Sequence, residues 1–416
     1  MILGVGATES QRVVSWYTST NDAQVVQVAP SNQIKKGVFP DDATSYSATT
    51  AANAVNGGYN AHVTIDGLKQ NTEYSYRVGT EGSWSPVYTF KTQTFYGASD
   101  WDFLFFGDPQ IGSSGSVAQD AAGWRGKAYE QHLWTPNTDR SASYYRNGNP
   151  AGAESGGDYW FIYKDVLFID LNSNAYANGA DAAHIGYVTS VVNAHGSQAK
   201  YTVLVYHHSI YSPADHANDN DNKIRRQDFP TAFSNLGVDL VLQGHDHSYS
   251  RSYEINNGQK ANPDEQPGDA EVTQGPGGVI YVTANSASGS KYYDLTAPVA
   301  GEYGPDPLNP KSHYANSVEN QRHVRTYVKV SVQNGQLVVQ DIRSGTCATP
   351  NSAVELRKVS WCGPNSGASP AQPVGSVVDS VVINSYDAKA VNNGADNNVD
   401  AVVQNGPSTT TVTTVS

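Results

Sequence analysis

The hydrophobic pattern of the chain changes near residue 97. Before that point, apolar and polar positions alternate with a period of two, as expected of strands that are buried on one face. The alternation is clearest in residues 12–17, 23–29, 62–65 and 74–78. Polar segments of turn length separate these runs. Residues 1–96 are therefore predicted to form an all-β sandwich, with Trp16 as its core indole.

From about Asp100 onward, apolar runs alternate with mixed segments, which is typical of an α/β sandwich. Strands are predicted for residues 102–106, 201–206 and 238–242, and helices for residues 182–195 and 222–236. Runs at residues 278–283, 324–332 and 336–342 predict antiparallel strands that complete a second sheet. We therefore expect two sheets flanked by helices over residues 97–345.

The C-terminal part has a different composition. Beyond about Gly363, Ser, Pro, Gly, Asn and Thr dominate, and residues 367–373 resemble a linker. We expect residues 346–416 to be a tail or the start of a further domain, with a short strand at 376–383 as the alternative. Cys347 and Cys362 enclose a loop of about fifteen residues, either as a disulfide worth roughly 3 kcal/mol or as two free thiols.

Charge narrows the possible functions. The chain has 26 basic and 39 acidic residues, for a net charge of −13. Since no basic patch occurs, neither nucleic acid nor an anionic membrane is expected as a partner. No apolar run reaches the length of about eighteen residues that a transmembrane helix needs. Residues 1–6 lead directly into the first strand without an export signal, which suggests a mature or truncated form.

Three apolar strands end in Asp or His. The endings are Gly107-Asp108, His207-His208-Ser209 and Gly244-His245-Asp246-His247. Residues i and i+2 of an extended segment project to the same side, so two of these imidazoles can converge. Open α/β sheets place their sites at the carboxyl ends of strands, and imidazole is the commonest metal ligand. Each ending alone is explained by a turn or a solvated loop. Together they predict a metal-dependent hydrolase with the ligands Asp108, His208, His245 and His247.

The same segments resemble the first and the last two blocks of the calcineurin-like metallophosphoesterases. The nearest branch is the purple acid phosphatases of the secreted bacterial type, which carry an N-terminal fibronectin-III-like domain. Residues 67–74 are similar to a fibronectin-III tyrosine-corner segment. The resemblance runs from about residue 3 to about residue 345. It implies a fibronectin-III-like sandwich, an α/β metallophosphoesterase sandwich, two metal ions and a small phosphate ester as substrate.

Two blocks of that family have no counterpart here. One is a Gly-Asp whose carboxylate bridges the metals, and the other is a Gly-Asn-His that supplies an Asn ligand and a phosphate-contacting His. Residues 119–124 run directly into residues 125–130, so an internal segment near 124–126 is expected to be absent. Asp158 is not the missing bridge, because the family places its segment after Gly-Asn-His, where it enters a core strand. We expect Asp158 to be structural.

The resemblance assigns Asp108 and His247 to one metal, and His208 and His245 to the other. In a complete family member these are iron with zinc, manganese or a second iron. Without a bridging carboxylate, two cations about 3.5–4 Å apart would repel strongly. One Asp and three His suit a single four-coordinate ion such as zinc instead. The sequence leaves open whether two ions, one or none are bound.

The implied reaction is hydrolysis of a phosphate ester by a metal-activated hydroxide, in a secreted, acid phosphatase-like enzyme. His216 lies where the family places substrate-contacting histidines, and it is the candidate phosphate contact or general acid. An ordinary loop histidine is the alternative. The alternative function is a weak or inactive relative that serves as an extracellular binding or structural protein.

Five other basic residues receive structural interpretations. His207 is expected to pack away from the site, because neighbours in a strand alternate. Arg225 and Arg226 are predicted to form a solvated helix face. His132 and His184 have no partner visible in the sequence.

Overall fold

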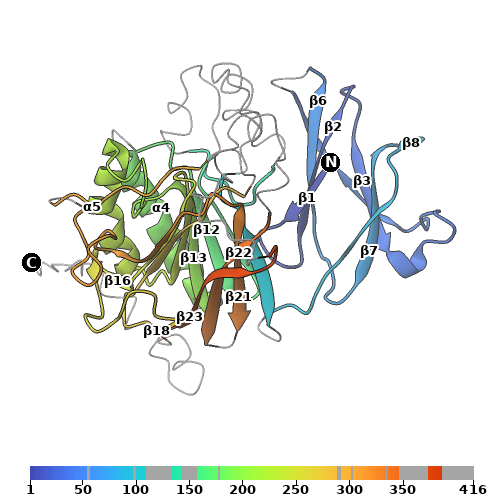
Figure 1. The fold of residues 1–416 in the computed structure, drawn as a ribbon. Helices are drawn as coiled ribbons and strands as arrows, with labels where there is room; N and C mark the ends of the chain where they lie inside the picture. Colours follow the sequence, from blue (N-terminus) through green and yellow to red (C-terminus); the bar gives the residue numbers. More distant parts are fainter. Residues whose placement is uncertain are drawn as a thin grey trace, which may run out of the picture.

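The computed structural model describes residues 1–53, 57–96, 100–108, 133–141, 157–176, 179–287, 292–300, 303–333, 335–345 and 373–386. An all-β region is followed by a larger α/β region (Figure 1). Three features predicted from the sequence lie outside the described residues: the junction near 124–126, His132, and the pair Cys347 and Cys362.

The first region is a sandwich of two antiparallel sheets, ordered β1-β2-β6-β5 and β4-β3-β7-β8, with β9 also paired to β7. The elements are β1 Ile2–Val5, β2 Arg12–Thr18, β3 Val25–Pro30, η1 Ser31–Gln33, β4 Thr44–Ser47, β5 Thr49–Ala52, β6 Tyr59–Ile65, β7 Glu73–Thr80, β8 Ser83–Trp84 and β9 Tyr88–Lys91. Their inward positions build an aliphatic and aromatic core. Trp16 is buried in it, and its Nε1 donates to Oε1 of Gln24 at 3.2 Å. The predicted all-β fold and core indole are confirmed.

The second region has three layers. Helices α4 (Ala180–His195) and α5 (Asn220–Asn235) cover one face of a seven-stranded sheet, and a five-stranded sheet covers the other (Figure 1). The seven-stranded order is β11-β12-β13-β14-β19-β15-β20, in which β12, β13, β14 and β19 run parallel. The five-stranded order is β10-β21-β22-β23-β18.

The remaining elements have the following bounds. They are β10 Trp101–Phe105, β11 Tyr159–Tyr163, β12 Val166–Leu171, η2 Gly196–Gln198, β13 Tyr201–His208, β14 Leu240–Gly244, β15 Tyr249–Ser252, β16 Ile255–Asn256, β17 Gln259–Lys260, β18 Glu271–Thr273, β19 Ile280–Thr283, β20 Asn316–Asn320, β21 Thr326–Gln333, β22 Gln336–Arg343 and β23 Val377–Asn384. The separate pair β16-β17 forms a small hairpin.

The central strands are apolar throughout because both of their faces are covered. In β12, Leu167 and Ile169 join the core beneath the helices, whereas Val166 and Phe168 join the core between the two sheets. None of the helices in the described ranges is long and apolar enough to cross a membrane.

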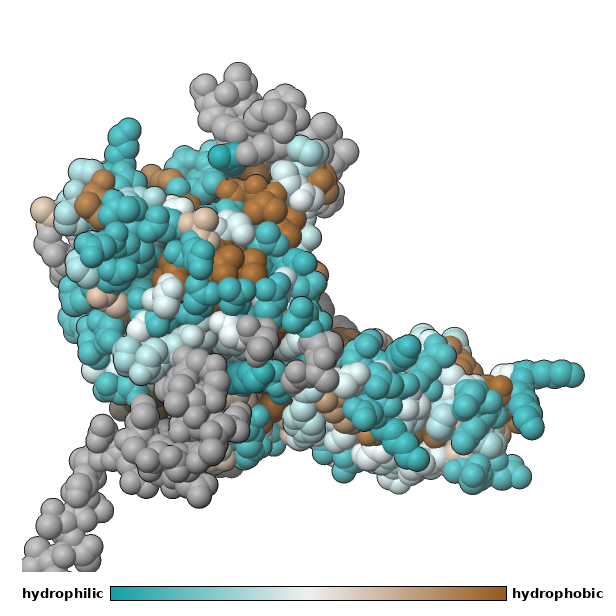
Figure 2. Space-filling view, turned by 90° about the horizontal axis from the view of Figure 1, so that it is seen from below, coloured by the Kyte–Doolittle hydropathy of each residue, from teal (hydrophilic) through white to brown (hydrophobic). Residues whose placement is uncertain are grey.

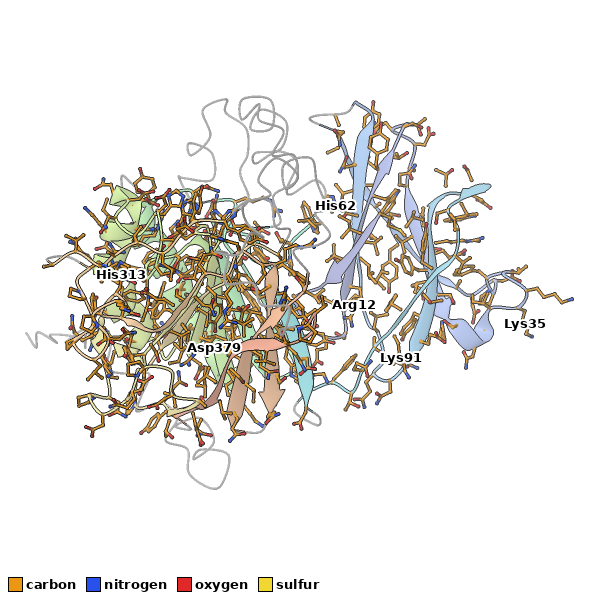
Figure 3. The ribbon with its side chains drawn as sticks, in the orientation of Figure 1. Arg12, Lys35, His62, Lys91, His313 and Asp379 are labelled. Carbon is orange, nitrogen blue, oxygen red and sulfur yellow. The ribbon has the colours of Figure 1, made fainter. Side chains whose placement is uncertain are left out.

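Two predicted placements were wrong. Strand β19 was expected in the second sheet, but it lies parallel to β14 in the seven-stranded sheet. Strand β23 was assigned to a tail or further domain, but it pairs with β22 and β18 inside the five-stranded sheet. The alternative of a short strand was correct. Asp379 of β23, labelled in Figure 3, forms an ion pair of 2.8 Å with the buried Arg251 of the other sheet, which anchors this late strand.

The two regions make direct contacts. The backbone N–H of Ile162 donates to the carbonyl of Ala7 at 3.0 Å. His62 lies on the side of β6 that faces the second region, and its ring stacks on Trp134 at 3.6 Å (Figure 3). Seen from below, the first region projects from the larger one as a separate lobe (Figure 2).

Candidate metal centre

The candidate ligands lie where the parallel strands end. Strand β13 ends at His208, which lies opposite Gly244, the last residue of β14. Strand β10 belongs to the other sheet, and Gly107 just beyond it pairs with Ser286 after β19. This pairing brings Asp108 to the ends of β13 and β14.

The predicted side chains meet around the Asp108 carboxylate. Its Oδ1 lies 3.3 Å from Nε2 of His247, and its Oδ2 accepts a hydrogen bond of 2.7 Å from the backbone N–H of His245. The rings of His208 and His245 have centroids 4.5 Å apart. The four residues selected from the sequence therefore lie together at one edge of the fold.

His207 also points into this place, contrary to the prediction. Its Nε2 lies 3.0 Å from Nδ1 of His245 and 3.7 Å from Oδ1 of Asp108. The register between β13 and β14 shifts between Val205 and His208, where β13 holds one extra residue. Such a β-bulge ends the strict alternation of side chains. The prediction that His207 packs away was wrong for this reason.

Three residues of the site have a backbone conformation that L-residues rarely adopt. The φ angles are 42° at Asp108, 77° at His245 and 44° at His247. Strain of this kind costs on the order of 1–3 kcal/mol per residue and is concentrated at functional sites. Gly244 is needed for a different reason, since a Cβ there would lie 2.6 Å from Oδ2 of Asp108.

A buried serine orients His208. The Oγ of Ser173, two residues beyond β12, accepts the backbone N–H groups of His207 and His208 at 3.1 and 3.2 Å. The same Oγ lies 2.8 Å from Nδ1 of His208. In the tautomer whose Nδ1–H donates to this Oγ, Nε2 of His208 keeps the lone pair that a metal ion can take. Outer contacts of this kind fix the orientation of metal-binding histidines.

Arg225 and Arg226 do not form the solvated helix face that was predicted. Arg225 is buried, donates to the carbonyl of Ser173 and pairs with Asp221 at 2.7 Å. Arg226 donates from Nη1 to the carbonyl of Ile210 at 2.7 Å. The prediction failed because both guanidinium groups donate to backbone carbonyls just after strands, at Ser173 after β12 and at Ile210 after β13.

His216 reaches the site on the loop between β13 and α5. Its ring stacks on that of His245 at 3.9 Å, and its Nδ1 lies 2.7 Å from Oδ2 of Asp219. The buried carboxylate of Asp246 accepts the backbone N–H groups of Ala214 and His216 at 2.9 and 3.0 Å. Asp246 thereby ties the His216 loop to the turn that carries His245.

The electrostatic environment disfavours protonation of His208 and His245. Burial first, and then neighbouring histidines, lower the pKa values of His208 and His245 to about 2. Burial alone would raise the pKa of Asp108, but hydrogen bonds from His247 and the backbone of His245, together with attraction to His207 and His247 when those rings are protonated, lower it to about 2. An ionised carboxylate beside imidazoles that resist protonation, His208 and His245, favours metal binding, which needs deprotonated ligands.

These donors fit a transition-metal ion. The ligand nitrogens of His207, His208 and His245 all lie within 4.8 Å of one another. Imidazole suits zinc and iron, and a carboxylate such as Asp108 completes a four-coordinate set. The sequence could have indicated His207 through the His-His pair, but the bulge that turns it inward has no sequence signal.

Asp158 and His184 have the structural roles predicted for them. Oδ2 of Asp158 lies 2.7 Å from Nδ1 of His184, and its Oδ1 accepts the backbone N–H of Asn172 at 2.8 Å. Both side chains are fully buried. Both oxygens of the Asp158 carboxylate are thus hydrogen-bonded, one to the His184 ring and one to the Asn172 backbone.

Comparisons with known proteins agree with the architecture. Residues 1–92 match the family described as "Purple acid Phosphatase, N-terminal domain". The chain is similar to the purple acid phosphatase PPD1 from seeds of yellow lupin (Lupinus luteus), with 16% identity and a TM-score of 0.61, over 92% of this chain and 73% of that chain. It also matches the structure of PhoD, with 14% identity and a TM-score of 0.49, over 84% of this chain and 87% of that chain. The resemblance to purple acid phosphatases is confirmed, and the fold of the lupin protein extends over both regions.

Proposed function

We propose that the chain is a metal-dependent phosphoesterase that hydrolyses small phosphate esters outside the cell, in the manner of an acid phosphatase. One observation carries the proposal: the imidazoles of His207, His208 and His245 and the carboxylate of Asp108 converge at the carboxyl ends of strands. Strained φ angles at Asp108, His245 and His247 support it, because the fold holds these side chains together despite the strain. The likeness to purple acid phosphatases supports the reaction class.

His207, His208 and His245 are the proposed ligands of one ion, with Asp108 beside them to balance its charge. His247 contacts the same carboxylate oxygen, Oδ1 of Asp108, at 3.3 Å. A bound ion at this place would lower the pKa of water toward about 7 and polarise the phosphoryl group. This assignment replaces the separation of ligands over two ions that the family resemblance implies.

His216 is the proposed proton donor. Its Nδ1–H donates to Asp219, so Nε2 is the ring atom that can reach a phosphate oxygen or the leaving group. As hydroxide adds to phosphorus and the ester P–O bond breaks, the departing alkoxide takes the Nε2 proton of the imidazolium form of His216, which leaves a neutral ring with its Nδ1–H on Asp219. Stacking on His245 places this ring directly beside the proposed ligands.

Hydrolysis of an aryl phosphate tests the proposal. The His208→Ala variant should lose turnover by at least about 100-fold and lose bound metal, since it removes a ligand. His195→Ala is the matched control, because the His195 ring at the end of α4 stacks on Trp160 of β11, outside the site. Equal turnover in the wild type and His208→Ala would refute the proposal.

A weak or inactive binding protein is the second candidate function. It is favoured by the Asp158 carboxylate, which is engaged with His184 and is not offered as a bridge between two metals. In that case the wild type would bind metal and inorganic phosphate but would not turn over any ester. Calorimetry with inorganic phosphate, run beside the hydrolysis assay, separates the two functions.

A further inference from the structure

A cavity of about 670 Å³ lies between the two sheets of the second region, at the edge where β10 and β11 face each other. Both are edge strands, β10 of the five-stranded sheet and β11 of the seven-stranded sheet. Val5 and Gln93 of the first region complete its wall. The volume is within the range of about 300–1,000 Å³ that is typical of small-molecule sites.

The cavity is walled by aromatic rings because alternate positions of three strands face it. The ring-bearing residues are Trp101, Phe103, Phe105, Tyr159, Phe161, Tyr163 and Phe168. Phe161 and Phe168 are stacked at 4.8 Å, and Trp101 meets Tyr163 edge-on at 5.1 Å. Flat faces and ring edges of this kind favour a planar guest, which can stack or pack edge-to-face.

One acid faces this aromatic space. Asp170 follows Phe168 by two positions in β12, so both side chains lie on the face between the sheets. It receives a hydrogen bond from Tyr159, the residue opposite it on β11. Burial, then the charge of Asp158, raise the pKa of Asp170 to about 8. Near neutral pH the group is therefore an acid that can donate a hydrogen bond.

The wall also holds the charged groups of Asp100, Asp102 and Lys164. Asp102 points to the outer face of β10 and pairs with Lys329 at 3.0 Å. Lys164 lies in the turn between β11 and β12, and Asp100 precedes β10. The walls of the cavity are mainly apolar, Asp170 is the acid that lies on the same face of β12 as Phe168, and none of the candidate metal ligands lines the cavity.

We propose that this cavity is a binding site for an uncharged planar aromatic molecule of one or two rings that carries one hydrogen-bond acceptor, with Asp170 as the donor that orients it. The site does not depend on the proposed phosphoesterase function.

Calorimetric titration with two matched probes tests this inference. 2-Acetylnaphthalene carries a carbonyl acceptor, and 2-ethylnaphthalene has the same rings without one. The acetyl probe should bind about threefold to tenfold more tightly, as expected for one neutral hydrogen bond. Asp170→Asn should keep this preference, because its amide N–H₂ also donates, whereas Asp170→Leu should abolish it. Phe161→Leu should weaken binding of both probes.

A second measurement needs no variant. The carbonyl stretching frequency of the bound acetyl probe should fall below its value in an apolar solvent, because a hydrogen bond weakens the C=O bond. An unshifted frequency, or a preference that persists in Asp170→Leu, would overturn the role of Asp170. Binding of both probes weaker than about 1 mM would overturn the site itself.

Discussion

The two regions of the chain differ in how they use left-handed backbone. In the described part of the first region, positive φ falls mostly on glycine: Gly37, Gly57, Gly58, Gly67, Gly79 and Gly82, beside Lys36, Asn71 and Tyr96. At the candidate site it falls on Asp108, His245 and His247. Glycine adopts this conformation readily, whereas other L-residues are destabilised by about 1–2 kcal/mol. The first region is thus built for packing, and the strand ends of the second hold particular side chains at the expense of stability.

The comparison is tested most strongly by replacing a strained ligand with glycine. His245→Gly should raise the free energy of unfolding of the metal-free protein by about 0.5–1 kcal/mol, because it relieves the positive φ. The same change should remove bound metal and lower hydrolysis by at least about 100-fold, since it deletes a proposed ligand. Lys36→Gly in the first region should give a similar gain in stability and leave hydrolysis unchanged, because Lys36 is exposed and has a φ of 52°. A His245→Gly variant that retains full metal content would contradict the claim that the strained backbone at this position serves metal binding.

Gly244 and Gly67 separate steric from conformational effects. Gly244→Ala places a Cβ 2.6 Å from the Asp108 carboxylate and should lower the free energy of unfolding by about 2–3 kcal/mol. Gly67→Ala meets no atom within 4 Å, but its φ is +69°, so it should cost only about 1 kcal/mol. Urea unfolding of both variants measures the difference. Equal losses would mean that Asp108 does not pack tightly against β14.

The cores of the regions should also differ in their response to pH. The first core is aliphatic and aromatic, whereas the second buries Asp341 between its sheets. Burial raises the folded pKa of Asp341 from its ordinary 3.8 to about 7. Between these values the folded state holds the proton, so stability falls as pH rises from about 4 to about 7.

Asp341→Asn should therefore remove about 2 kcal/mol of the stability difference between pH 5 and pH 8. The exposed Asp264→Asn is the matched control and should leave the difference as it is. Thermal unfolding at the two pH values gives the result. An Asp341→Asn variant with the full wild-type pH dependence would show that another group is responsible.

The smallest effect is expected from the substitution Ser173→Ala, which should change only the affinity for metal. Its Oγ orients His208 without touching substrate, so Ser173→Ala should weaken metal binding about tenfold. Ser190→Ala is a matched control, because that hydroxyl bonds to the backbone of α4 at its exposed side. Competition with a coloured chelator measures the affinity. Unchanged affinity would assign Ser173 to packing alone.

Much of this arrangement could be predicted from the sequence. The apolar runs that become β13 and β14 are distinctive, and parallel strands end at one edge, so the meeting of His208, His245 and His247 follows from pattern. The inward turn of His207 could not be predicted, because it depends on a bulge formed against the neighbouring strand. Nor could the insertion of β23, since long-range pairing and the Arg251 ion pair decide it.

The content of bound metal tests the central claim most directly. Protein purified without chelators and dialysed against metal-free buffer would be analysed for zinc, iron and manganese, beside His208→Ala. The three-histidine centre predicts about one ion per wild-type chain and a clear loss in the variant. No metal above background in the wild type, even after addition of each ion, would contradict it.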